Sequence, residues 1–122
     1  AGYSRYRKSG PPTELTAAQR AKTPDMPHPA VRTHPVTGKK GLFVNEGYTT
    51  DIVGMVPAES RALLELLFEH MKEDRFVYRH KWRKGDFLIW DNCATQHRAV
   101  IDYELPLRRR MERTTLAGSV PF

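Results

Sequence analysis

The sequence predicts a mainly β fold of the jelly-roll kind, built from short antiparallel strands with one amphipathic helix. Several short runs alternate apolar and polar residues, which is the pattern of strands that bury one face. These runs lie close together along the chain, and turn-forming residues separate them. A single stretch carries apolar residues at helical spacing instead. Short strands at close spacing are typical of antiparallel architectures such as the jelly roll.

Residues 1–29 are predicted to form a loop. Prolines that block regular helix and central strand are spread through this segment: Pro11, Pro12, Pro24, Pro27 and Pro29. One short helical turn is expected between Thr13 and Arg20. Because an independent domain rarely begins with so long a loop, we expect residues 1–29 to be a loop or lid from the middle of a larger domain. Residues 30–122 would then form the C-terminal part of that domain.

Two short extended runs follow, at residues 30–33 and 41–45. The residues between them include Pro35 and Gly38, which suit a turn between antiparallel strands. After Gly54, the spacing of the apolar residues predicts a helix with one side packed in the core. That apolar stripe consists of Leu63, Leu64, Leu66, Leu67, Phe68 and Met71.

Three more strands are predicted in the remaining chain. Residues 76–82 alternate in character, and a Gly-Asp turn leads into a second strand at residues 87–90. A polar loop then leads to His97. The last strand is expected to run from about residue 107 to residue 117.

Side-chain alternation gives the last predicted strand two different faces. One face looks solvated and carries Arg108, Arg110, Glu112 and Thr114. The other mixes aliphatic residues with Arg109 and Arg113, and an arginine on an apolar face needs an anionic partner. At roughly 3.3 Å per residue the two Cα atoms lie about 13 Å apart, which favours two separate anions or two ends of one pocket. Pairing of both arginines with internal Asp or Glu residues is the alternative.

His97 follows a strand and a polar loop. A histidine at a strand end of a jelly roll is well placed to bind a metal ion through neutral imidazole, and an exposed or hydrogen-bonded histidine is the alternative. The other histidines show no metal-ligand spacing and are expected to be structural or exposed: His28, His34, His70 and His80. Cys93 has no histidine base at a diagnostic spacing, so a thiol nucleophile has little support.

The formal net charge of +6 raises the question of nucleic-acid binding. The basic residues are spread along the chain, however, and an enzyme that handles anions would carry the same excess, so we expect no nucleic-acid partner. The one cysteine fits a reducing cytosol, and neither a membrane-spanning apolar run nor a secretory leader is found. We therefore expect a cytoplasmic protein without a membrane partner. A homo-oligomer is compatible with the sequence.

Two stretches of the chain carry a family resemblance. The first runs from Trp90 to Ala99, reads WDNCATQHRA, and is followed by an Asp-Tyr pair and the motif RRRMER at residues 108–113. The second comprises VRTHPVTGKK at residues 31–40 and LFVNEGYTT at residues 42–50. Together they resemble the taurine dioxygenase / 2,4-dichlorophenoxyacetate dioxygenase family, most closely its taurine branch, over about residues 29–121.

The resemblance implies a double-stranded β-helix with Fe(II) held by two histidines and one carboxylate, and 2-oxoglutarate as co-substrate. His97 would be the second histidine of that triad. Arg109 would bind the far carboxylate of 2-oxoglutarate, and Arg113 would bind the anionic group of the primary substrate. Tyr48 would pack against the substrate, at a position where the taurine branch looks to carry Phe.

One departure from the family pattern concerns the other two iron ligands. They come from a His-x-Asp or His-x-Glu motif, and no histidine here has an acidic residue two positions later. The family's chain is also about twice as long. The chain is therefore expected to be a fragment of the enzyme, with a degenerate paralogue as the alternative.

The sequence thus predicts an oxidoreductase that couples decarboxylation of 2-oxoglutarate to hydroxylation of a small anionic substrate by O₂. The substrate would carry a sulfonate, sulfate or carboxylate group. Two alternatives from other classes are a non-catalytic, basic, β-rich module that binds nucleic acid, and a metal-free anion sensor.

Overall fold

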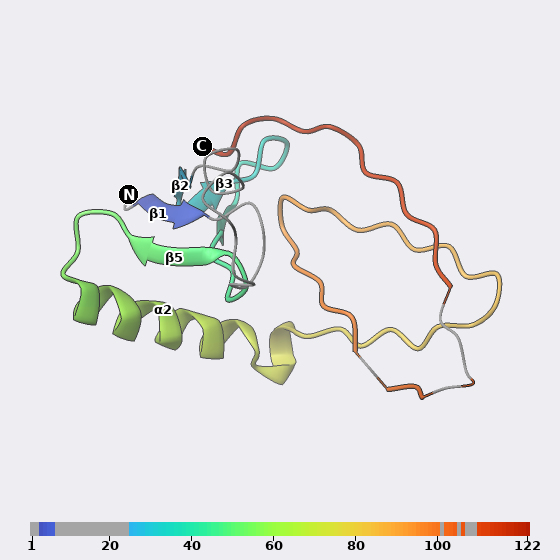
Figure 1. Cartoon of the computed structure of the whole chain (residues 1–122). Helices are drawn as coiled ribbons and strands as arrows, with labels where there is room; N and C mark the ends of the chain where they lie inside the picture. The colour runs from blue at the N-terminus through green and yellow to red at the C-terminus, as the bar shows by residue number, and fades with distance from the viewer. Residues whose placement is uncertain (1–2, 7–24, 101, 105, 107–109) are drawn as a thin grey trace, which may run out of the picture.

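In the part of the chain that the structure describes, the strands form two small antiparallel sheets and one helix packs beside them. The computed structural model describes residues 3–6, 25–100, 102–104, 106 and 110–122. Its elements are β1 (Tyr3–Tyr6), β2 (Met26–Pro29), β3 (Val31–Thr33), β4 (Lys40–Leu42), β5 (Thr49–Ile52), α2 (Pro57–Met71) and the 3₁₀ turn η1 (Asp74–Phe76). One sheet has the order β2-β1-β5, and the other pairs β3 with β4. Figure 1 shows α2 lying along β5.

The first sheet shows that the predicted loop over residues 1–29 is wrong at residues 3–6 and 26–29, which form strands. β1 pairs antiparallel with both β2 and β5, with Ser4 opposite His28 on one side and Ile52 on the other. The prolines of β2 are tolerated because β2 is the edge strand of this sheet, where a missing N–H interrupts no second ladder. The helical turn expected between Thr13 and Arg20 lies outside the described residues.

The second sheet is the predicted hairpin. β3 and β4 pair in the register Val31 to Leu42 and Thr33 to Lys40, so this prediction is confirmed, with the second strand at 40–42. Gly38 takes the positive φ of +68° that closes the connecting turn, where glycine meets no steric penalty. Thr33 N–H also donates to the carbonyl oxygen of Phe122 at 2.7 Å, which holds the end of the chain beside β3 (Figure 1).

The predicted helix is confirmed as α2, which begins with Pro57, a residue favoured in the first turn. Its Leu64 is buried against Ile52 and Val44, and Leu67, Phe68 and Met71 pack partly against this core. The Ser60 hydroxyl accepts the N–H of Ile52 at 2.7 Å inside the core, which fixes α2 against β5. Leu66 is 64% exposed and Leu63 is 37% exposed, so the predicted apolar stripe is wrong at these two positions. The sheet covers only a narrow sector of the helix.

The three strands predicted after α2 are not present in the part of the chain that the structure describes. η1 takes up residues 74–76, and residues 77–90 and 110–117 are irregular. Most of their large apolar side chains are exposed, including Tyr78 at 80% and Phe87 at 86%. The physical reason is that no pairing strand lies beside them among the described residues, and a strand needs a neighbour to satisfy its N–H and C=O groups. Figure 1 shows this chain extending as an open loop to one side of the sheet and the helix, with its end back beside β3.

The described residues therefore bear out the coarser part of the fold prediction, which is several short antiparallel strands with one helix. None of the helices among these residues has the length and apolar character needed to cross a membrane.

Candidate functional site

The polar loop before His97 is a tight turn organised by Asp91. The Asp91 Oδ1 atom accepts the backbone N–H of Cys93 at 2.7 Å. The Asp91 carbonyl oxygen accepts both the N–H and the hydroxyl of Thr95, at 2.9 and 2.6 Å. Aspartate favours such turns because its short side chain bonds the backbone two residues on. The turn fixes the path of the chain into Gln96 and His97.

His34 holds this turn against the β3–β4 hairpin. The His34 Nδ1 atom accepts the N–H groups of Val36 and Thr37, both at 3.1 Å. The proton of a neutral ring must therefore sit on Nε2, which lies 2.6 Å from Asp91 Oδ2 and donates to it. This hydrogen bond, followed by that from the Cys93 N–H, lowers the pKa of Asp91 below its ordinary value of 3.8. The structural role predicted for His34 agrees with these contacts.

Gln96, the residue before His97, bonds to the chain that follows β4. Its Nε2 donates to the carbonyl oxygen of Val44 at 2.6 Å, and its Oε1 accepts from Asn45 Nδ2 at 2.7 Å. Val44 is fully buried in the core. The segment that carries His97 is thus attached to the sheet and helix at two points, Asp91 and Gln96.

Asn45 begins a second tight turn, over residues 45–49, that carries Tyr48. The Asn45 carbonyl oxygen accepts the N–H groups of Tyr48 and Thr49, at 3.1 and 2.7 Å. The Asn45 Oδ1 atom accepts the N–H of Gly47 at 2.9 Å. A Cβ atom at position 47 would lie 3.3 Å from that oxygen, so glycine permits the close approach. Tyr48 is partly exposed on this turn, at 36%.

Lys72 attaches the same turn to the end of α2. Its Nζ lies 2.8 Å from Glu69 Oε1 and 3.1 Å from Glu46 Oε2. The hydrogen bond to Glu69, then that to Glu46, raises the pKa of Lys72. All three side chains are exposed, so the bridge contributes little stability but restrains the turn.

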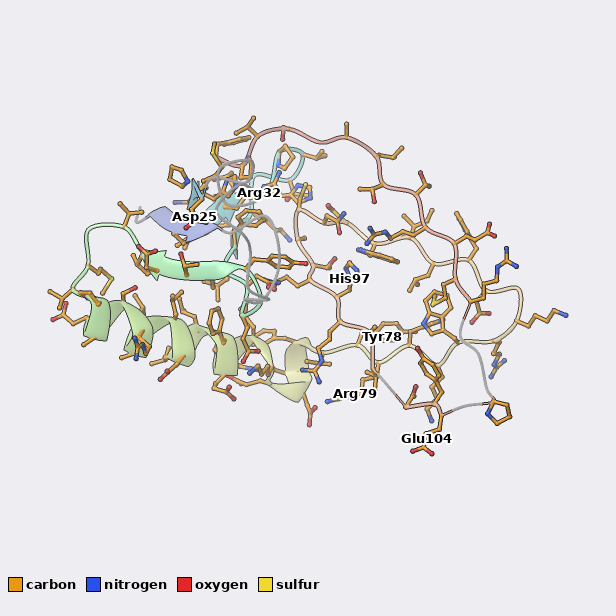
Figure 2. The ribbon with its side chains drawn as sticks, in the orientation of Figure 1. Asp25, Arg32, Tyr78, Arg79, His97 and Glu104 are labelled. Atoms are coloured by element: carbon orange, nitrogen blue, oxygen red, sulfur yellow. The ribbon has the colours of Figure 1, made fainter. Side chains whose placement is uncertain are left out.

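His97 is exposed, and its ring lies against Trp90 with 4.7 Å between the ring centroids. The Trp90 indole N–H in turn donates to Asn92 Oδ1 at 2.9 Å. Figure 2 shows His97 beyond the sheet, within the irregular part of the chain. An exposed imidazole with a fixed backbone and an aromatic neighbour is free to accept a metal ion.

A complete metal site is not present among residues 3–6, 25–100, 102–104, 106 and 110–122. No group of three or more His, Cys, Asp or Glu side chains lies close enough together there to hold an ion. Fe(II) bound by two histidines and a carboxylate does not fit these residues alone, because His97 would supply one ligand of three.

Only one of the two arginines predicted to bind anions lies among the described residues. Arg109 lies outside the described residues. Arg113 is exposed in an irregular segment, so its predicted place on an apolar strand face is not seen. Arg110, predicted to be solvated, is exposed and lies 3.5 Å from Glu112. Of the four predicted site residues, the structure links the segments of Tyr48 and His97 and leaves Arg113 on the surface.

Sequence reasoning missed Asn45, Asp91 and Gln96. Turn-forming residues at Asn45-Glu46-Gly47 and Asp91-Asn92 are the local signal for the two turns. Nothing local signals that Gln96 reaches residue 45, because the two positions are 51 residues apart.

A family model and several known proteins are similar to this chain in sequence. The family model described as "Taurine catabolism dioxygenase TauD, TfdA family" matches residues 1–115. The chain is 40% identical over 106 residues to the alpha-ketoglutarate-dependent 2,4-dichlorophenoxyacetate dioxygenase of Burkholderia sp. (strain RASC), covering 87% of this chain and 35% of that protein. It is 42% identical over 94 residues to the alpha-ketoglutarate-dependent sulfate ester dioxygenase of Pseudomonas putida, covering 77% and 31%.

A solved structure is also similar. The crystal structure of AAD-2 in complex with Mn(II) and N-oxalylglycine matches with a TM-score of 0.59 and 29% identity, over 67% of this chain and 34% of that chain. The chain spans about a third of the length of the two curated relatives, at 35% and 31%.

Proposed function

Since the chain belongs to the taurine catabolism dioxygenase TauD, TfdA family, we propose that it is part of an Fe(II)- and 2-oxoglutarate-dependent dioxygenase. The enzyme would use O₂ to hydroxylate a small anionic substrate. The observation that carries this proposal is the family match over residues 1–115, which includes His97, Arg109 and Arg113.

His97 is assigned as one of the three iron ligands. Support comes from its exposed ring and from the two hydrogen-bonded attachments of its segment, which fix the backbone without occupying the imidazole. The other two ligands must lie outside the described residues. This division agrees with a chain that spans about a third of its relatives, at 35% and 31%.

Arg109 and Arg113 are assigned to two different anions, the far carboxylate of 2-oxoglutarate and the anionic group of the substrate. Guanidinium suits both because its fork donates two parallel hydrogen bonds. Tyr48 is assigned to pack against the substrate, supported by its partial exposure on a restrained turn. The relatives are named for phenoxyacetate and sulfate ester substrates, so a carboxylate, sulfate or sulfonate group is proposed.

Residues 30–122 are proposed to be the C-terminal part of a double-stranded β-helix, with residues 1–29 from the middle of the same domain. The exposed, alternating apolar side chains of the irregular chain support this assignment, because neighbouring strands of a complete β-helix would bury one face of them. A cytoplasmic location is proposed from the single cysteine.

The test is turnover by the complete gene product. Succinate formation from 2-oxoglutarate under air would be measured with an alkyl sulfonate, an alkyl sulfate or an aryloxyacetate present. At least one of these should stimulate succinate formation in the parent, and His97→Ala should remove most of it, because one of the three proposed iron ligands is lost. His70→Ala is the matched control, because His70 lies on α2 and bonds to Glu73 at 2.7 Å.

Unchanged turnover in His97→Ala would remove this residue from the iron site. Binding of the parent to DNA or RNA without any succinate formation would favour a nucleic-acid module instead.

A further inference from the structure

We infer that Asn45 and Gln96 are positioning residues, whose side-chain hydrogen bond holds the turn of Tyr48 in a fixed relation to His97. This inference rests on the proposed function, because it supposes that Tyr48 contacts substrate and that His97 binds iron. Neither Asn45 nor Gln96 is itself assigned a contact with substrate or metal.

The first support is the geometry of Gln96. Its side chain uses both amide atoms, since Nε2 donates to Val44 at 2.6 Å and Oε1 accepts from Asn45 at 2.7 Å. Gln96 is exposed, and an exposed glutamine ordinarily keeps its rotamer freedom. Its fixed conformation therefore depends on these two bonds and on a weaker contact from Nε2 to Met71 Sδ at 3.7 Å. The backbone of Gln96 continues directly into His97.

The second support is that Asn45 has no polar group left over. Its N–H donates to the Thr49 hydroxyl at 2.9 Å, and its carbonyl oxygen and Oδ1 accept N–H groups within the turn. Nδ2 alone reaches out of the turn, to Gln96. Because one planar amide carries both the bond to Gly47 and the bond to Gln96, rotating it would break both. The conformation of the turn and its link to Gln96 are thus coupled.

A continuous path follows from these bonds. It runs from the Tyr48 N–H to the Asn45 carbonyl, from the Asn45 amide to the Gln96 amide, and along one peptide bond to His97. An aromatic side chain against the substrate and a metal-binding imidazole must keep a fixed separation, because a displacement of about 1 Å can cost on the order of 100-fold in rate. Losing the bridge should therefore uncouple decarboxylation of 2-oxoglutarate from hydroxylation of the substrate.

The His34–Asp91 bond supplies the matched comparison. It attaches the other end of the same segment, at 2.6 Å, but to the β3–β4 hairpin and not to the turn of residues 45–49. If Gln96 merely helps to hold its own segment, removal of either attachment should have the same local effect. If Gln96 and Asn45 couple two segments, only their variants should disturb both.

The experiment uses the complete gene product with Asn45→Asp, Gln96→Leu and His34→Ala. Asn45→Asp keeps the acceptor for Gly47 N–H and removes the donor to Gln96. In the metal-free proteins, hydrogen exchange is measured at residues 45–49 and 94–97. Gln96→Leu should speed exchange at residues 45–49 about tenfold, the loss of one hydrogen bond. His34→Ala should speed exchange only in its own hairpin and at residues 91–95.

The second readout is the ratio of hydroxylated product to succinate in the iron-loaded enzyme. This ratio should fall at least about threefold in Asn45→Asp and Gln96→Leu, with the affinity for 2-oxoglutarate unchanged. Unchanged exchange at residues 45–49 in Gln96→Leu would overturn the inference. Faster exchange at residues 45–49 together with an unchanged ratio of product to succinate would also overturn it, because the hydrogen bond between Asn45 and Gln96 would then have a structural role only. A parent that forms no succinate would overturn the proposed function, and the positioning role with it.

Discussion

Two regions of the chain have similar local sequence patterns, but the structures of their described residues differ. The first region comprises residues 3–6 and 25–76, and the second comprises residues 77–122. The first region pairs its strands, buries Val44, Ile52 and Leu64, and fixes α2 against β5 through Ser60. The second region carries alternation at residues 77–82 and a continuous apolar run at residues 87–90, but its described part contains no strand and exposes most side chains. Alternation of apolar and polar residues therefore indicates that a segment can form a strand, and a strand forms only where a second strand pairs with it.

The proposed site lies mostly in the second region. His97, Arg109 and Arg113 are there, and Tyr48 alone comes from the first. Side chains connect the segment of His97 to the first region, through His34 with Asp91 and Asn45 with Gln96, and a backbone bond joins Thr33 to Phe122. Each turn of the proposed site is formed by residues that are close in sequence, whereas the relative position of the two turns depends on hydrogen bonds between residues that are far apart in sequence. The predictions below test that division.

The largest effect is expected from Arg109→Leu in the complete gene product. A carboxylate of 2-oxoglutarate left buried without its arginine should lose roughly 3 kcal/mol of binding, or about 100-fold in Kd. Isothermal titration with 2-oxoglutarate measures the loss. Arg110→Leu is the control, because Arg110 is exposed beside Glu112. Equal losses in both variants would contradict the assignment of different faces to neighbouring arginines.

Leu64→Ala should destabilise the first region by about 3 kcal/mol, since it opens a cavity in a small core. Leu66→Ala on the exposed side of the same helix should change stability by less than about 0.5 kcal/mol. Urea unfolding of the two variants gives the difference. Similar costs would mean that α2 is covered on both sides in the complete protein.

Arg113→Lys should raise the substrate KM about tenfold while the affinity for 2-oxoglutarate barely moves. Lysine keeps the charge but loses the two parallel hydrogen bonds, and the loss should be confined to one site. Steady-state kinetics at saturating 2-oxoglutarate, together with a melting curve, distinguishes binding of the substrate by Arg113 from pairing of Arg113 with an internal carboxylate. A lower melting temperature with an unchanged KM would show that Arg113 pairs with an internal carboxylate.

The smallest effect concerns pH and the attachment at Asp91. The folded protein lowers the pKa of Asp91 below 3.8, with the His34 hydrogen bond as the main cause. The stabilisation is therefore fully present above about pH 4 and is lost as the pH falls through the lower, folded value. Melting temperatures between pH 3 and 6 should fall more steeply for the parent than for Asp91→Asn. Parallel curves would show that this bond does not stabilise the fold.

The sequence predicted those elements whose partners are near along the chain. The hairpin of β3 and β4 and the helix α2 follow from turn residues and from helical spacing. β2 was missed because its prolines argue against a strand and nothing local shows that it is an edge. β1 was missed because its partners, β2 and β5, lie far along the chain. The strands predicted after α2 are not observed for the opposite reason. Their sequence pattern is typical of strands, but no pairing strand lies among the described residues.

The site divides in the same way. Family motifs assign His97, Arg109, Arg113 and Tyr48, whereas the bonds that relate Tyr48 to His97 come from amides with no motif of their own. A glutamine and an asparagine 51 residues apart become partners only when the fold brings them together.

The most direct measurement is an anaerobic Fe(II) titration of the 122-residue chain and of the complete gene product, both with 2-oxoglutarate. The chain alone should bind Fe(II) weakly and without a fixed stoichiometry, because His97 is one ligand of three. The complete product should bind one equivalent tightly, and His97→Ala should abolish that binding. Tight binding of one equivalent by the 122-residue chain would contradict the division of the site between this chain and the remainder of the protein.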